Sequence, residues 1–140
     1  MKKISLFFIL SLIASTLSAC ATPAEMRQRA PELEFKSTFP SKTVAICIAD
    51  RWENLSWVGG TIPVNMRPTN DGYTVSWRNE AWGHTGLLVD IKDTTDGSLT
   101  RYFKNMVLGE GTFDQVVIDC QDPKKITIEP NTKGNTINKP

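Results

Sequence analysis

The chain has 140 residues, which is enough for one domain of ordinary size. Its composition is 40% hydrophobic and 22% charged, and its formal net charge is +1 at pH 7. A charge this close to zero excludes a strongly basic nucleic-acid-binding protein, because such a protein must neutralise a run of phosphates. It also excludes an acidic disordered tail as the main feature. We therefore expect a globular domain and no nucleic-acid partner.

The N-terminus has the three-part layout of a secretory signal peptide. Lys2 and Lys3 give it a positive start, residues 4–13 (ISLFFILSLI) are apolar, and small residues lead to Cys20. The alternative is a buried or membrane-spanning helix. The apolar stretch is shorter than the roughly 20 residues that a spanning helix needs, which favours the signal peptide.

The sequence Leu17-Ser18-Ala19-Cys20 resembles the lipobox of bacterial lipoproteins, which a dedicated signal peptidase cuts before the cysteine. The resemblance implies that residues 1–19 are removed. It also implies that Cys20 carries a diacylglyceryl thioether and an acylated amino terminus, the several fatty chains that firm membrane anchoring requires. In such lipoproteins of enteric bacteria, an aspartate after the cysteine favours retention in the inner membrane, so by this analogy Ala21 implies the outer membrane, with the domain facing the periplasm. Loss of Lys2 and Lys3 takes the net charge from +1 to about −1.

Lipidation of Cys20 leaves Cys47 and Cys120 as an even pair in an oxidising compartment, which favours a disulfide between them. The chain-entropy model gives such a loop roughly 4 kcal/mol of stabilisation. Two buried free thiols are the alternative. We expect no metal or cofactor, because the chain has no Cys-x-x-Cys motif and its single histidine is His84.

The predicted elements begin after a tether. Residues 20–35 carry the lipidated cysteine and a linker with two prolines, in which residues 24–29 could form a short helix. Residues 42–54 are predicted to form an amphipathic helix with Ser41 as N-cap. Its apolar face has helical spacing and consists of Val44, Cys47, Ile48, Trp52 and Leu55.

The middle of the chain alternates apolar and polar residues, as strands do. Residues 62–66 and 73–77 are predicted to pair as a hairpin around the turn at residues 68–72. Residues 87–91 and 99–107 are predicted as a third and a fourth strand. Pro63 favours an edge position for the first.

A second helix is predicted where Thr112 and Gln115 fit a capping box. Its apolar stripe at helical spacing consists of Phe113, Val116, Val117 and Cys120. Residues 123–140 are predicted to be a polar flexible tail, with residues 126–128 as a possible edge strand.

These elements predict an α+β domain over residues 36–122: a four-stranded, mainly antiparallel sheet packed against two helices in the order α-β-β-β-β-α, with one disulfide. Over about residues 40–121 the domain resembles small Gram-negative lipoproteins. These share a cysteine-containing helix ending in Trp-Glu (here Trp52-Glu53), four strands and a late helical cysteine. The resemblance implies no activity.

Catalytic chemistry has two candidate sets of residues. His84, in the loop 82–86, could act with Asp50, Asp90 or a serine, but no nucleophile-elbow motif is present, and a solvated loop histidine is the alternative. Acidic residues in or near turns could flank a sugar, although acids are common in turns for local hydrogen-bonding reasons. They are Asp71, Glu80, Asp90, Asp93 and Asp96.

A partner-binding surface is the alternative to catalysis. Trp57 and Trp82 lie near glycines and are expected to be exposed with His84 and Tyr102, as aromatic residues at binding surfaces often are. The alternative is that both tryptophans cover the rim of the core. We expect a non-catalytic envelope lipoprotein that binds a protein or cell-wall partner. A periplasmic inhibitor or immunity protein, or a small glycan-acting enzyme, remain alternatives.

Overall fold

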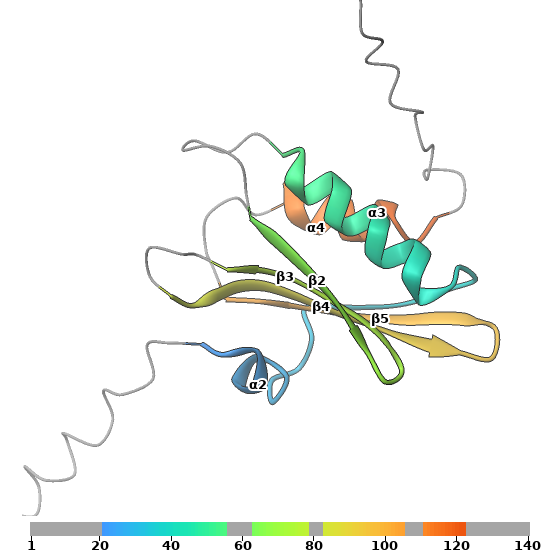
Figure 1. Cartoon of the computed structure of the whole chain (residues 1–140), viewed down its shortest axis with the longest axis horizontal. Coiled ribbons are helices and arrows are strands. Elements are labelled where there is room, and N and C mark those ends of the chain that lie inside the picture. Colours follow the sequence, from blue (N-terminus) through green and yellow to red (C-terminus); the bar gives the residue numbers. More distant parts are fainter. Residues whose placement is uncertain (1–20, 56–62, 79–82, 106–110, 123–140) are drawn as a thin grey trace, which may run out of the picture.

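The computed structural model of the chain describes residues 21–55, 63–78, 83–105 and 111–122. They form an antiparallel sheet of five strands with helices on both faces (Figure 1). The elements in chain order are α2 (Pro23–Met26), β1 (Leu33–Ser37), α3 (Ser41–Glu53), β2 (Val64–Thr69), β3 (Gly72–Arg78), β4 (Thr85–Thr94), β5 (Gly97–Lys104) and α4 (Thr112–Asp119). The strands lie in the order β1-β5-β4-β3-β2.

The two faces of the sheet carry different elements. Helices α3 and α4 lie together over one face, which we call the helix face, and α2 lies on the opposite face, which we call the far face (Figure 1). Because side chains alternate along a strand, each strand contributes every second residue to the helix face and the others to the far face. This alternation decides which polar residues of neighbouring strands lie side by side on the far face.

The structure confirms an α+β fold with one disulfide, but the expected order α-β-β-β-β-α is wrong, because the described residues form five strands and three helices in the order α-β-α-β-β-β-β-α. Residues 33–37 form the fifth strand, β1, which pairs with β5 from Leu33 opposite Tyr102 to Ser37 opposite Ser98. Leu33 and Phe35 pack against the helix-face core, whereas Glu34 is exposed. The strand is short and lies at the edge of the sheet, so its alternation is too brief to stand out within a linker rich in charge and proline.

Trp52 of α3 is central to the helix-face core, with its side chain fully buried. Its ring centroid lies 6.2 Å from that of Tyr102 and 6.2 Å from that of Phe113, and its Nε1 donates a hydrogen bond to the Phe113 carbonyl oxygen at 3.4 Å. The aliphatic core residues around it come from α3, from α4 and from β3 and β4: Val44, Ile48, Val75, Leu87, Val89, Ile91, Val116 and Val117. One large aromatic side chain therefore joins both helices to the sheet.

The predicted disulfide between Cys47 and Cys120 is present and joins α3 to the end of α4. The two Cα atoms are 5.8 Å apart, although the residues are separated by 73 positions in the sequence. The bond closes a loop that contains the four strands β2 to β5, so it constrains most of the domain in the unfolded state.

Both long helices begin differently from expectation. Ser41 is the first residue of α3 and Pro40 is its N-cap, so the expected N-cap role of Ser41 is wrong. Gly111 is the N-cap of α4, and no side chain caps that helix, so the expected capping box is also wrong. Gly111 has a φ of 98°, which glycine adopts without strain, and it occupies the position that Thr112 needs for capping.

The N-terminal segment is folded onto the far face, so the tether predicted for residues 20–35 does not extend to residue 35. Thr22 and Glu25 form a capping box at the start of α2, with Pro23 at the first helical position. Ala21 and Met26 are buried in a small apolar cluster with Leu88 and Phe103 of the sheet. The Thr85 N–H also donates a hydrogen bond to the Ala21 carbonyl oxygen at 3.2 Å.

Three predicted features are not covered by these elements. The signal peptide, Cys20 and the tail 123–140, with its possible strand at 126–128, lie outside the described residues. Within the described ranges, no helix has the length and apolarity needed to cross a membrane.

Candidate functional site

A row of polar side chains crosses the far face, one from each strand. The strand registers place Arg67 of β2 opposite Thr74, Thr74 opposite Asp90, Asp90 opposite Arg101, and Arg101 opposite Glu34 of β1. All five residues share the face opposite the α3–α4 core, because their neighbours Val75, Val89 and Tyr102 belong to that core. Along the row, the charges of Glu34, Arg101 and Asp90 alternate in sign. Beyond the neutral Thr74, the row ends in the cation Arg67 on β2.

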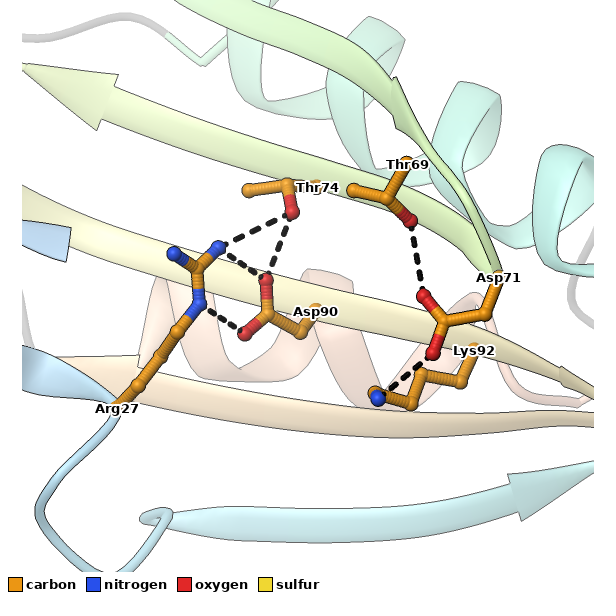
Figure 2. A network of polar contacts seen from close by, with 6 residues as sticks. All are labelled: Arg27, Thr69, Asp71, Thr74, Asp90 and Lys92. Atoms are coloured by element: carbon orange, nitrogen blue, oxygen red, sulfur yellow. Dashed lines mark hydrogen bonds and ion pairs between the residues drawn. The ribbon is translucent and has the colours of Figure 1, made fainter. Parts of the chain in front are cut away.

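The N-terminal segment reaches the middle of this row through Arg27, the residue that follows α2. The Arg27 guanidinium donates from Nε and Nη2 to the two carboxylate oxygens of Asp90, each at 2.7 Å (Figure 2). The Thr74 hydroxyl donates to the same carboxylate at 2.8 Å, and Arg27 Nη2 also donates to Thr74 Oγ1 at 3.2 Å. The hydrogen bonds to Asp90 raise the pKa of Arg27 further above its ordinary value.

A second polar pair lies on the same side, near the turn between β2 and β3. Lys92 Nζ is 2.7 Å from Asp71 Oδ2, and the Thr69 hydroxyl donates to Asp71 Oδ1 at 3.2 Å (Figure 2). The hydrogen bond from Lys92 is the main cause that lowers the pKa of Asp71. Asp71 is therefore held as a carboxylate.

These residues line a groove of about 430 Å³ on the far face. Its charged lining consists of four cations and two carboxylates: Arg27, Arg67, Lys92 and Arg101, with Asp71 and Asp90. Phe103, from the apolar cluster beneath α2, also lines it. The volume falls in the range of small-molecule sites, and the excess of cations suits an anionic ligand.

Arg67 differs from the other three cations. Arg27 and Lys92 are paired inside the groove, and Arg101 pairs with Glu34 at 2.7 Å outside it. Arg67 is exposed, and no carboxylate of the described ranges lies within ion-pair distance of it. Its five N–H donors are therefore available to an anion.

The predicted partner-binding residues are not brought together by the described structure. Tyr102 is fully buried and its hydroxyl donates to Asp114 at 2.9 Å, so the expectation that it is exposed is wrong. It faces the helix side, because its position in β5 alternates with that of Arg101. His84 lies partly buried just before β4 and does not line the groove. Trp57 and Trp82 lie outside the described residues.

Two of the five acids considered for catalysis, Asp71 and Asp90, do line one groove. The hydrogen bond from Lys92 lowers the pKa of Asp71, which makes that carboxylate a poor proton donor, and both oxygens of Asp90 accept hydrogen bonds from Arg27. Asp93 accepts a hydrogen bond from the Ser41 N–H at 3.3 Å, Asp96 lies in the β4–β5 turn, and Glu80 lies outside the described residues. In the described part of the chain, no cluster of His, Cys, Asp and Glu could hold a metal ion.

The groove residues Arg27, Arg67 and Arg101 were missed from the sequence. Within its own segment, each is a single charged residue at a position expected to face solvent, and nothing nearby in the sequence marks it as part of a site. The signal that could have found them is the set of outward strand positions aligned by register: Arg67, Thr74, Asp90 and Arg101. Register depends on turn geometry, which the sequence specifies less clearly than strand identity.

Comparison with known proteins adds no relative: no family model, curated protein or solved structure matches this chain.

Proposed function

We propose that this chain is a lipid-anchored protein of the bacterial cell envelope whose small, non-catalytic domain binds a protein or cell-wall partner. The signal-like N-terminus and the Leu-Ser-Ala-Cys sequence support the anchor. In this proposal the mature chain begins at Cys20, is acylated there, and faces the periplasm from the outer membrane.

The observation that carries the proposal is the packing of Ala21. A fatty chain on Cys20 would begin one residue from Ala21, which is buried against Leu88, Phe103 and Met26 on the far face. The folded domain thus begins immediately after the anchor, and the ion pair between Arg27 and Asp90 fastens this start to the sheet. A lipid there holds the domain close to the membrane surface.

The groove supports binding over catalysis. A glycan-acting enzyme needs one carboxyl group that can donate a proton and a second that stays ionised. Both oxygens of Asp90 accept hydrogen bonds from Arg27, and Asp71 has a lowered pKa beside Lys92. Asp71→Asn and Asp90→Asn should therefore leave the composition of the cell wall unchanged in cells that depend on this protein. A changed muropeptide profile in either variant would favour the enzyme.

Fractionation of cells together with crosslinking tests the proposal as a whole. The wild-type chain should sediment with membranes, partition into detergent, and give a defined crosslinked partner. Cys20→Ser should abolish the detergent partition, and Ser18→Thr serves as a control that changes the same motif but keeps the thiol. Detergent partition that survives in Cys20→Ser would overturn the anchor, and the absence of any defined partner would overturn the binding role.

A further inference from the structure

The charge of the domain is divided between its two sides, although its net charge is close to zero. The groove on the far face carries four cations and two carboxylates. Helices α3 and α4, on the opposite side, carry two basic and four acidic residues: Lys42 and Arg51, with Asp50, Glu53, Asp114 and Asp119. Glu34, which pairs with Arg101, brings the far-face count to four cations and three carboxylates, and Lys104, which pairs with Asp114, brings the helix-side count to three cations and four carboxylates. The far face is therefore cationic relative to the helix face.

The cationic side is also the side on which the proposed anchor begins. Ala21 and α2 pack on the far face beside Phe103, and Phe103 also lines the groove. A lipid on Cys20 would thus bring the far face to the bilayer before the helix face. A charge a few ångströms from the headgroups is only weakly screened, because the Debye length is about 8 Å at physiological salt.

The groove has the chemistry that recognises a phosphate. Arg67 presents a guanidinium with no carboxylate partner among the described residues, and Arg101 lies three strands away in the same cross-strand row. A guanidinium donates two parallel hydrogen bonds to a phosphate, which gives geometric as well as electrostatic selectivity. The two groove carboxylates are already neutralised by Arg27 and Lys92, so they repel an incoming phosphate less than free carboxylates would.

We infer that the far face, through Arg67 and the groove beside it, contacts the phosphate headgroups of an anionic lipid bilayer. This inference rests on the proposed anchor, which sets the distance between domain and membrane. The domain then lies with its far face on the membrane, and α3 and α4 face the periplasm. The protein or cell-wall partner of the proposed function meets the helix face.

Photocrosslinking from each side of the domain tests this orientation. Benzoylphenylalanine replaces either Asn65, on the far face of β2, or Ile46, an exposed residue of α3. The full chain is made in a Gram-negative host, and the purified product is mixed with vesicles of phosphatidylcholine, with or without phosphatidylglycerol. The lipid adduct at each position and the acyl mass on Cys20 are measured on the same sample.

The expected adduct forms from the Asn65 position, increases when phosphatidylglycerol is present, and is weak from the Ile46 position. Arg67→Gln should lower it about fivefold, the effect expected for one basic residue near an anionic surface. Lys42→Gln removes a positive charge from α3 and should leave it unchanged. Arg67 is exposed and lacks an ion-pair partner in the described ranges, so its replacement should not disturb folding.

Failures of the two proposals give different results. If the protein is acylated but both positions give equal adducts, the headgroup contact is wrong and the anchor is supported. The same conclusion follows if the Asn65 adduct changes neither with phosphatidylglycerol nor with Arg67→Gln. Protein without acyl mass overturns the anchor. In that unacylated sample, a lipid adduct that depends on Arg67 still supports the headgroup contact. If no such adduct forms, the headgroup contact is overturned as well.

Discussion

Arg27 and Asp90 join the N-terminal segment to the centre of the sheet through two parallel hydrogen bonds, each 2.7 Å long. The two residues are 63 positions apart in the sequence. The pair fixes α2 over Leu88 and Phe103, and it also places a third guanidinium in the far-face groove, in addition to those of Arg67 and Arg101. One contact therefore holds the N-terminal segment in place and shapes the candidate site.

Replacing Arg27 should loosen this segment. Arg27→Gln removes a charge-assisted pair whose side chains are 38% and 16% exposed, so the loss, discounted for solvent, should be about 1 kcal/mol. Hydrogen exchange of residues 22–29 should accelerate more than that of the core. Glu34→Gln, which breaks the more exposed pair with Arg101, is the control and should cost less than about 0.5 kcal/mol. Equal losses in both variants would contradict the role of Arg27.

The disulfide should account for much of the stability of the domain. Cys47→Ala with Cys120→Ala should lower the free energy of unfolding by about 2–5 kcal/mol, because the bond closes a loop of 73 positions. Denaturant unfolding with and without a reductant measures this loss. Reductant should destabilise the wild type and have no effect on the double variant. A wild type that is insensitive to reductant would show that the bond contributes little.

Trp52 should be the most sensitive core position. Trp52→Ala removes a fully buried ring that contacts Tyr102 and Phe113, and losses of this kind are about 3–5 kcal/mol. Ile46→Ala, on the outward side of the same helix, should change stability by less than about 0.5 kcal/mol. Thermal unfolding followed by circular dichroism compares the two. A loss of stability in Trp52→Ala as small as that in Ile46→Ala would contradict the central role of Trp52 in the core.

Tyr102 should make the domain sensitive to alkaline pH. Burial, together with the hydrogen bond to Asp114, raises the pKa of the Tyr102 phenol far above its ordinary value of 10. The unfolded chain therefore loses this proton at a lower pH than the folded protein. The stability contributed by the neutral phenol is complete below about pH 10 and falls as the pH rises above it.

The variant Tyr102→Phe isolates this effect, because it keeps the ring and removes the ionisable group. At neutral pH its free energy of unfolding should be lower than that of the wild type, because the variant lacks the hydroxyl that donates a hydrogen bond to Asp114. The difference between the two proteins should shrink as the pH rises from about 10 to about 12. A constant difference over that range would show that Tyr102 has an ordinary pKa.

Much of the helix-face architecture could be predicted from local patterns. The apolar spacing of Val44, Ile48 and Trp52 identified α3, and the positions of Cys47 and Cys120 on two apolar faces identified the bond between the helices. The signals for these elements are long and repeat over several turns, so they are strong in a single sequence. The alternation on either side of the expected turn identified the β2–β3 hairpin in the same way, although Pro68 and Thr69 belong to β2 and Gly72 belongs to β3, so the turn is shorter than expected.

The far face could not be predicted in this way, because its features depend on long-range pairing. Strand β1 has five residues and becomes recognisable only beside β5, and α2 has four residues whose burial depends on Leu88 and Phe103. Tyr102 was misplaced because an alternating strand does not by itself say which of its sides meets the helices. The groove required both the register of the strands and the return of Arg27 to the sheet.

The most direct test of the account is the mass of the N-terminal peptide of the mature protein, purified from cell envelopes. We expect a chain that begins at Cys20 and carries a diacylglyceryl group on its sulfur and an acyl group on its amino terminus. A chain that keeps residues 1–19, or one whose first cysteine is unmodified or bridged to another cysteine, would contradict it.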